Sequence, residues 1–263
     1  MNFKDKVIWI TGASSGIGEY LAYAFAQRGA KLIISSRNQQ ELERVQQHCA
    51  PGTEVLILPL DVSKFDLIPE IAQRAISHFG RLDLLINNAG ISQRALIKET
   101  DFSVDKKIME VNYLGSIAVT KAVLPTLLAQ QSGHIVTISS VMGKFGAPWR
   151  SAYAASKHAL QAWFDSLRAE VHQDNIKVTI ICPGYVRTNV TINALKGDGS
   201  KNNKMAAQTE KGLDPAVFAE KAIRAIAAEK EEVLIGGKEI IAVYFKRFFP
   251  GIFSYFVKKI SLS

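Results

Sequence analysis

Short runs of apolar, often β-branched residues alternate with longer helical patterns along most of the chain. The apolar runs stand at 7–10, 31–35, 54–58, 82–86, 134–138, 177–181 and 232–235. They are apolar at successive positions, so both faces of each strand are expected to be buried. Strands of this kind, separated by helices, are typical of a parallel sheet with right-handed crossovers. We therefore predict an α/β fold, a doubly wound sheet of seven parallel strands with about six helices on its two faces.

The chain carries no linker or internal repeat, so we expect residues 1–263 to form a single domain. One long irregular stretch, 183–213, contains the polar run KGDGSKNNK. Loops of this length in a compact domain are usually functional or disordered. This one leaves the carboxyl end of the sixth strand, where open α/β sheets bind ligands. We expect it to cover a substrate as a lid, with a passive connection as the alternative.

Cysteine use and the start of the chain bear on its location. The two cysteines, Cys49 and Cys182, have no metal-binding spacing, so we expect neither a disulfide nor a metal site. Such sparing use of cysteine suits a reducing compartment. The first residues, MNFKDKV, show no charged-then-apolar leader. We therefore expect a cytoplasmic protein.

The charge balance limits the kinds of partner. Of the 263 residues 48% are hydrophobic and 21% are charged, with a net charge of +8. A basic chain of this kind suits nucleic acid, anionic lipid or a phosphorylated ligand. Because the lysines and arginines are spread thinly and form no basic helix interleaved with stacking aromatics, we expect no nucleic-acid partner.

The stretch TGASSGIG joins the first strand to the first helix. Gly12 permits a tight turn, and Gly16 and Gly18 allow a phosphate and the sheet to approach the backbone closely. The helix N-terminus favours an anion, and Ser14 and Ser15 can add hydroxyl donors. No Gly-Lys-Ser/Thr follows, which argues against a nucleoside triphosphatase loop. Taken alone, the turn fits a dinucleotide, another phosphate or no ligand.

The end of the second strand bears on the choice of dinucleotide. The residues there, IISSRN, include no acid to bind the adenosine ribose, as NAD sites usually do, and offer Ser36 and Arg37 instead. A guanidinium binds a phosphate bidentately, whereas a carboxylate would repel it. We predict NADP(H) in preference to NAD(H); a solvated surface arginine is the alternative interpretation.

A second group of residues suggests the chemistry. Tyr153 and Lys157 of YAASK are four apart in a predicted helix and share one of its faces. Tyr255 and Lys259 have the same spacing. However, Ser140 lies thirteen residues before Tyr153, at the end of a buried strand, and no such strand end precedes the second pair. We therefore assign the reaction to the first pair.

These three side chains suit hydride transfer to or from a carbonyl. An unperturbed phenol has a pKa near 10, and Lys157 together with an oxidised nicotinamide would favour its phenolate. In reduction, Tyr153 would give its proton to the developing alkoxide while Ser140 hydrogen-bonds the same oxygen. We predict an NADP(H)-dependent oxidoreductase acting on a small carbonyl or alcohol. A dinucleotide-binding sensor or scaffold without turnover is the alternative, although no catalytic residue is missing.

The motifs together resemble a known family. TGASSGIG, NNAG at 87–90, Asn112, Ser140, YAASK and PG at 183–184 follow the order and spacing of the short-chain dehydrogenase/reductase family over nearly the whole chain. The segments DFSVDKKIMEVNY, RSAYAASKHALQAWFD and PGYVRTNVTINA are more narrowly similar to its member 7 and 7B group. The resemblance implies a Rossmann fold and a homodimer or homotetramer. That group carries an N-terminal membrane anchor with no counterpart in MNFKDKV, so we do not carry its membrane address over.

The resemblance also implies further site residues. Asn112 would complete the catalytic set by holding a water that relays protons to Lys157, Asp61 would contact the adenine end, and Ile17 would meet the pyrophosphate. Structural alternatives are a helix cap for Asp61, a satisfied turn for Asn88 and simple exposure for Thr188. The residues implied to line the ribose side are Asn88, Ala89 and Gly90, and those at the nicotinamide are Tyr153, Lys157, Pro183, Gly184, Val186 and Thr188.

The C-terminal segment 238–263 is aromatic and basic. Lys246, Arg247 and Pro250 interrupt its apolar run, so it is too broken to span a bilayer. Packing on the core or a partner subunit, peripheral contact with a membrane surface, and a greasy substrate entrance are the three hypotheses for it. A set of bulky residues near the predicted lid favours a lipid, steroid, retinoid-like or aromatic carbonyl substrate. These residues are Met142, Phe145, Trp149, Tyr185 and Val190.

Overall fold

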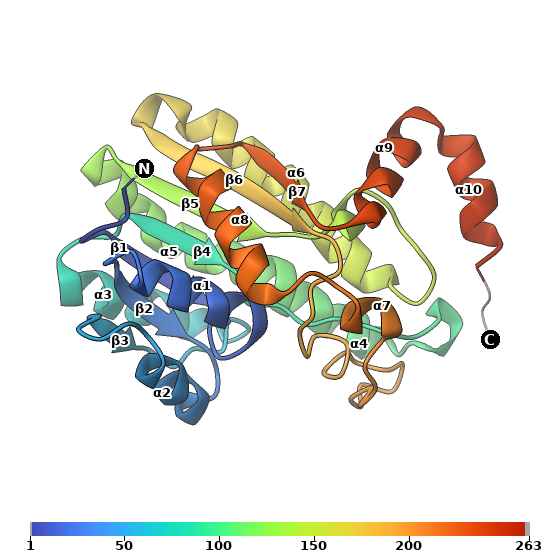
Figure 1. Ribbon diagram of the computed structural model, residues 1–263, viewed down its shortest axis with the longest axis horizontal. Coiled ribbons are helices and arrows are strands. Elements are labelled where there is room, and N and C mark those ends of the chain that lie inside the picture. The colour runs from blue at the N-terminus through green and yellow to red at the C-terminus, as the bar shows by residue number, and fades with distance from the viewer. Residues whose placement is uncertain (1, 261–263) are drawn as a thin grey trace.

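A computed structural model describes residues 2–260; residue 1 and residues 261–263, the ends of the predicted domain and of the predicted C-terminal segment, lie outside the described residues. Seven parallel strands form one sheet in the order β3-β2-β1-β4-β5-β6-β7 (Figure 1). The prediction of a doubly wound α/β fold is confirmed, with strand ends shifted by at most two residues. The strands are β1 (Val7–Thr11), β2 (Lys31–Ser35), β3 (Val55–Ile57), β4 (Leu84–Asn87), β5 (Gly133–Ile138), β6 (Ile176–Pro183) and β7 (Glu232–Ile235).

The described residues hold more helices than the roughly six expected. The difference comes from short elements: a separate α4 before α5, one helical turn inside the stretch 183–213, and two helices after the last strand. The helices are α1 (Gly16–Ala26), α2 (Gln39–Gln47), α3 (Ile68–Phe79), α4 (Phe102–Met109), α5 (Gly115–Gln130), α6 (Ser151–Val171), α7 (Ala207–Glu210), α8 (Pro215–Ala227), α9 (Ile241–Phe248) and α10 (Pro250–Lys258).

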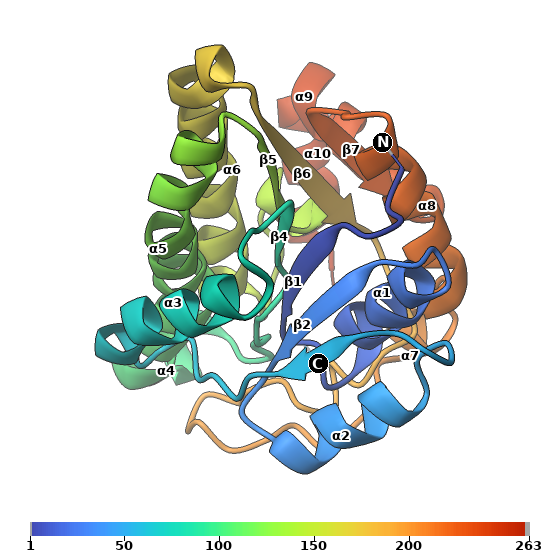
Figure 2. The ribbon, with the colours of Figure 1, turned by 90° about the vertical axis from the view of Figure 1, so that its left-hand side faces the viewer.

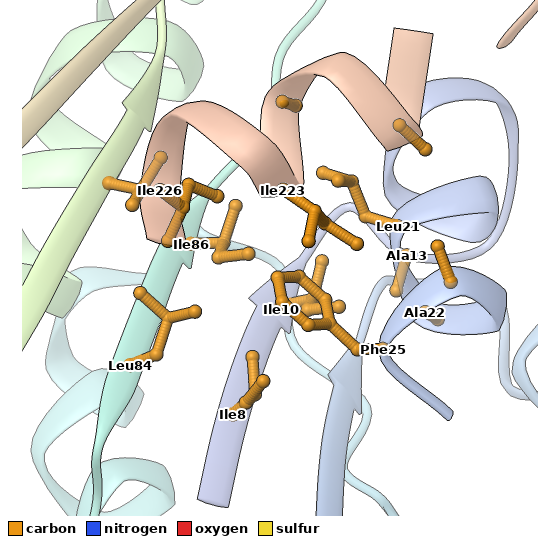
Figure 3. Packing of buried hydrophobic residues seen from close by; sticks show 14 of the residues in the cluster. Ile8, Ile10, Ala13, Leu21, Ala22, Phe25, Leu84, Ile86, Ile223 and Ile226 are labelled. Atoms are coloured by element: carbon orange, nitrogen blue, oxygen red, sulfur yellow. The ribbon is translucent and has the colours of Figure 1, made fainter. Parts of the chain in front are cut away.

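The strands bury both of their faces, as their continuous apolar runs predict. Ile8 and Ile10 belong to one cluster with Phe25 of α1 and Ile223 of α8 (Figure 3). The intervening Trp9 points to the opposite face, where α3, α5 and α6 supply a second cluster. Figure 2 shows α1 and α8 on one side of the sheet and α3, α5 and α6 on the other. Because helices cover both faces, the sheet offers a ligand access mainly at its edges.

The carboxyl edge of the sheet contains the point at which strand order reverses. β1 lies between β2 and β4, so the chain runs outward from β1 in one direction and returns to continue in the other. In open α/β sheets this reversal leaves a crevice at the carboxyl ends of the strands, and ligands bind there. The glycine turn follows β1 directly and therefore opens onto this crevice.

One helical stretch within residues 2–260, Phe102–Gln130, is long and apolar enough to cross a membrane by length and composition. Its α5 part packs Val119, Val123 and Leu127, all fully buried, beneath the sheet. Burial in the protein core accounts for the apolar character of those residues.

Candidate active site

A cleft of about 1270 Å³ opens at the carboxyl edge of the sheet, and it gathers the predicted site residues from segments far apart in sequence. Two of the predicted residues, Gly18 and Asn112, do not line it. Those that do are Gly12, Ser14, Ser15, Gly16, Ile17, Ser36, Arg37, Asp61, Asn88, Ala89, Gly90, Ser140, Tyr153, Lys157, Pro183, Gly184, Val186 and Thr188.

The glycines of the β1–α1 turn have separate reasons to lack a side chain. Gly12 and Gly16 adopt φ of 65° and 58°, in the left-handed region that favours glycine. A Cβ on Gly12 would lie 2.8 Å from the Cα of Ala89, and one on Gly16 would lie 3.0 Å from Cγ2 of Thr188. Gly18 does not line the cleft, and a Cβ there would overlap the Gly12 carbonyl oxygen and lie 2.5 Å from Asn88 Nδ2. The turn thus brings bare backbone to the cleft at the start of α1.

Asn88 ties the ends of β1 and β4 together. Its Nδ2 donates hydrogen bonds to the carbonyl oxygens of Thr11 and Gly12, each at 3.0 Å. The backbone N–H groups of Asn88 and Ala89 both donate to the Thr11 hydroxyl at 3.1 Å. The side-chain amide of Asn88 therefore satisfies backbone carbonyls of the glycine turn, as the structural alternative for this residue proposes.

Arg37 and Asp61 lie in the cleft wall at the ends of neighbouring strands. The exposed guanidinium of Arg37 makes no hydrogen bond or ion pair with other residues of the described range 2–260. Asp61 accepts hydrogen bonds from the N–H of Ser63 at 3.0 Å and its hydroxyl at 2.7 Å. These bonds close a local turn, and the helix-cap alternative for Asp61 is wrong, because the next helical turn starts after Lys64 and has no side-chain cap. Burial raises the pKa of Asp61, but these bonds and the charges of Lys107 and Arg37 outweigh it and hold the pKa below its ordinary value. The Asp61 carboxylate and the unpaired guanidinium of Arg37 therefore lie near each other in the cleft wall.

Tyr153 and Lys157 lie on the cleft face of α6, four residues apart as predicted. The Lys157 side chain is 5% exposed, and its Nζ donates a hydrogen bond to the carbonyl of Ile138 at 2.8 Å. This Nζ lies 5.8 Å from the centroid of the Tyr153 ring. Burial lowers the pKa of Lys157 to about 8. The ammonium is therefore held beside the phenol and titrates within the working range of an enzyme.

The environment of Tyr153 contains opposing influences on its proton. Burial raises the pKa of Tyr153, while the Ser140 hydroxyl and the positive charge of Arg150 lower it. Ser140 lies two residues beyond the end of β5 and is 7% exposed, and its Oγ accepts a hydrogen bond from the N–H of Met142 at 3.1 Å. Since that bond uses an acceptor position, the hydroxyl hydrogen of Ser140 stays available to donate.

Asn112 sits one layer behind the cleft, in a π-helical turn (Glu110–Leu114) between α4 and α5. Its Oδ1 accepts from the N–H of Ile91 at 2.8 Å, and its Nδ2 donates to the Ile91 carbonyl at 2.9 Å and to Ser156 Oγ at 3.0 Å. A Cβ on Gly90 would lie 3.2 Å from Asn112 Oδ1 and 3.7 Å from Lys157 Nζ. Asn112 thus positions the strand-end loop against α6. Its predicted water relay stays a prediction.

Two arginines belong to the site although sequence reasoning did not single them out. Arg150 Nη1 donates to the Gln93 carbonyl at 2.7 Å and to the Ser92 hydroxyl at 2.5 Å, just before the helix that carries Tyr153. Arg44 of α2 donates to the Ser14 carbonyl at 3.1 Å and so braces the glycine turn. Arg150 begins the segment RSAYAASKHALQAWFD, but the sequence assigns neither arginine a role, because each acts through contacts with a distant segment.

The stretch 183–213 lies over the cleft, where Asn189, Asn193 and Leu195 line it together with Gly199 and Lys201. It includes the short helix α7, which the sequence did not predict. Isolated bridges join Leu195 to Gln93 and to Lys201, tying the stretch to itself and to the site. Its placement suits a cover, while its opening as a lid stays a prediction.

The bulky apolar residues expected around a substrate are only partly there. Val190 lines the cleft, whereas Met142, Phe145, Trp149 and Tyr185 do not. Phe145 instead packs against a helix after the last strand, and Trp149 lies under the guanidinium of a neighbouring arginine. The predicted decoy pair also lies outside the cleft, in α10 and at its end, with Lys259 Nζ over the Tyr255 ring at 4.2 Å. Cleft position, rather than spacing, separates the two Tyr–Lys pairs.

The fold and the cleft together define the class of dinucleotide-dependent α/β oxidoreductases, and comparison with known proteins agrees. The sequence model described as "short chain dehydrogenase" matches residues 6–198. The chain belongs to the short-chain dehydrogenase/reductase family, whose members are hydride-transferring oxidoreductases. The resemblance noted from its motifs is thereby confirmed.

Relatives and solved structures cover nearly all of the chain. It is 44% identical over 260 residues to a Drosophila melanogaster "dehydrogenase/reductase SDR family protein 7-like", covering 97% of this chain and 80% of the relative. It is 43% identical to the Bos taurus "dehydrogenase/reductase SDR family member 7B", covering 95% and 79%. A Burkholderia phymatum short-chain dehydrogenase/reductase in complex with NAD superposes with a TM-score of 0.84 at 26% identity, covering 94% of each chain. An alcohol dehydrogenase from Thermococcus sibiricus, complexed with 5-hydroxy-NADP, gives 0.75 at 28% identity, covering 89% of this chain and 97% of that one.

Proposed function

We propose that the protein transfers hydride between NADP(H) and the carbonyl or alcohol group of an apolar small molecule. The observation that carries the proposal is a single cleft with two kinds of wall. Tyr153, Ser140 and the buried Lys157 converge on one part, and the glycine turn and Arg37 form another. The first part suits proton transfer at a carbonyl oxygen, and the second suits a phosphorylated dinucleotide.

The residues at the dinucleotide end fit such a group. A side chain on Gly12 or Gly16 would crowd Ala89 or Thr188, so the turn offers bare backbone to a pyrophosphate. Ser15 precedes α1 without a side-chain cap, which leaves helix N–H groups for an anion. The unpaired guanidinium of Arg37 suits a 2′-phosphate. Since one structural neighbour was solved with NAD and another with an NADP derivative, the preference for NADP(H) rests on Arg37. When bound, the nicotinamide supplies or accepts the hydride.

The reacting residues divide the proton chemistry. In reduction, the Tyr153 hydroxyl donates its proton to the substrate oxygen while the Ser140 hydroxyl hydrogen-bonds the same oxygen. Burial raises the pKa of Tyr153, which keeps the phenol protonated and ready to donate. The Lys157 ammonium, oriented by the Ile138 carbonyl, then stabilises the phenolate that is left.

Several apolar side chains line the cleft. They are Ile91, Val104 and Val111, together with Val190 and Leu195 of the covering stretch. Such walls favour an apolar carbonyl or alcohol, because burial of apolar surface drives its binding. The free thiols of Cys49 and Cys182 support the cytoplasmic location that belongs to the same proposal.

The test is NADPH oxidation against a panel of aldehydes and ketones, with Tyr153→Phe as the decisive variant. We expect this variant to lose turnover while it still binds NADPH, because the phenol proton is gone and the glycine turn is intact. Tyr255→Phe is the matched control, since Tyr255 also precedes a lysine by four residues but lies outside the cleft. Full activity in Tyr153→Phe would refute the proposal. NADPH binding with no oxidation by any panel member would favour the sensor or scaffold.

A further inference from the structure

The helices α9 and α10 form a hairpin that stands away from the sheet layers (Figure 1). An aromatic seam holds the two helices together. The ring centroid of Phe245 lies 5.8 Å from that of Phe249 and 6.3 Å from those of Phe253 and Phe256. Phe253 is 8% exposed, and its ring lies 5.2 Å from that of Phe145 in the loop before α6. One side of the hairpin is therefore used for internal packing.

The remaining sides expose large apolar groups. On α9, Ile241, Tyr244 and Phe248 are 65%, 55% and 69% exposed, at spacings of three and four residues. On α10, Ile252 and Phe256 are 51% and 57% exposed, four residues apart. Residues at these spacings share one face of a helix, so each helix leaves an apolar stripe uncovered. Clustered exposure of this kind marks an interaction surface.

The charge of the hairpin indicates what it binds. Residues 240–260 contain Lys246, Arg247, Lys258 and Lys259 and no aspartate or glutamate. Basic side chains beside exposed aromatic and aliphatic ones match the surface of an anionic membrane. A second copy is the less suitable occupant, because a twofold contact between two hairpins would bring eight like charges together without a carboxylate from either.

The hairpin is also tied to a loop that lines the cleft through Gly184. Glu239, just before α9, accepts hydrogen bonds from the N–H of Tyr185 at 2.8 Å and of Gly237 at 2.9 Å. Its carboxylate occupies the space that a Cβ on Gly184 would need. Phe253 packs on Phe145 as described. A surface bound to the hairpin would therefore lie near the Gly184 loop, which lines the cleft.

We propose that the α9–α10 hairpin is a docking surface for anionic lipid membranes. The proposal does not depend on the reaction, since it rests on exposure and charge outside the cleft. Its test is co-sedimentation of the full chain with phosphatidylcholine vesicles, with and without about 30% phosphatidylserine. We expect binding to the mixed vesicles to be roughly tenfold stronger at low salt and to weaken towards that of pure phosphatidylcholine in about 0.5 M NaCl.

Paired substitutions test the apolar contribution. Phe248→Ser with Ile252→Ser should reduce vesicle binding at least roughly tenfold, because two exposed apolar groups are removed. Phe65→Ser with Leu67→Ser is the matched control. These residues are also exposed, at 37% and 53%, and they follow β3, at the opposite edge of the sheet from β7 and the hairpin. The control should bind vesicles as the unmodified protein does.

Thermal melting and NADPH binding show whether each variant is folded, and vesicle binding needs neither cofactor nor turnover. Failure of docking and failure of the proposed reaction are therefore told apart. Equal binding to both kinds of vesicle would overturn the proposal, as would unchanged binding of the Phe248→Ser, Ile252→Ser variant. A dimer that this variant abolishes, without vesicle binding, would assign the surface to a second copy and equally overturn it.

Discussion

The buried ammonium of Lys157 donates a hydrogen bond to the backbone carbonyl of Ile138 at the end of β5, 2.8 Å away. The same Nζ lies 5.8 Å from the centroid of the Tyr153 ring. The site is desolvated, and this burial lowers the pKa of Lys157 to about 8. Burial of Lys157 therefore carries a cost to folding that changes with pH.

The free energy of unfolding should therefore depend on pH through Lys157. Lys157 has a pKa of about 8 in the folded state and an ordinary value of 10.5. Between these values the unfolded state binds more protons, so the contribution of Lys157 to the free energy of unfolding rises with pH, by up to about 3 kcal/mol. Lys157→Met lacks this rise. Urea unfolding of both proteins at pH 7 and 10 should show the stability of the unmodified protein gaining about 2 kcal/mol relative to the variant. A difference that is the same at both pH values would contradict it.

The charge of Arg150 should affect the pH dependence of alcohol oxidation. Because its positive charge lowers the pKa of Tyr153, Arg150→Gln should raise that pKa and move the midpoint of the rate profile to higher pH. We expect kcat below that midpoint to fall on the order of tenfold, with a smaller change in KM. Arg150→Lys keeps the charge and should keep the midpoint. If both variants keep the midpoint of the unmodified protein, Arg150 serves only to brace Ser92 and Gln93.

The proposed preference for NADPH should depend on Arg37. In Arg37→Ala the ratio of kcat/KM for NADPH to that for NADH should fall at least about tenfold, because a charge-assisted hydrogen bond to phosphate is lost. Arg74→Ala, a change at an exposed arginine of α3, is the control and should leave the ratio unchanged. An unaltered ratio in Arg37→Ala would remove the basis for NADP(H).

The packing of Gly18 makes a prediction about the glycine turn. An alanine Cβ there would overlap the Gly12 carbonyl and the Asn88 amide, which together shape the turn. We expect Gly18→Ala to weaken NADPH binding at least about tenfold and to lower the free energy of unfolding by about 1–3 kcal/mol. Gly251→Ala, where a Cβ meets nothing within 4 Å, should change neither quantity in that direction. Fluorescence titration with NADPH and thermal melting measure both. Normal NADPH affinity in Gly18→Ala would show that the turn tolerates the shift.

The sequence by itself determined the features that depend on local order. The seven apolar runs predict the seven strands, because a strand buried on both faces must be apolar at successive positions. The glycines of TGASSGIG predict the turn, since Gly12 and Gly16 take backbone angles that other residues adopt rarely. The spacing of Tyr153 and Lys157 places them on one helix face because a helix repeats every 3.6 residues.

Only the tertiary structure decided which distant residues meet. It left Gly18 and Asn112 outside the lining of the cleft, brought Arg150 beside Ser92, and placed Phe145 against the C-terminal hairpin rather than in the cleft. None of these outcomes follows from residue type or spacing, because a guanidinium or a phenyl ring is equally compatible with several neighbours. The choice among those neighbours is made when the chain packs both faces of the sheet and the carboxyl ends of its strands come to one edge.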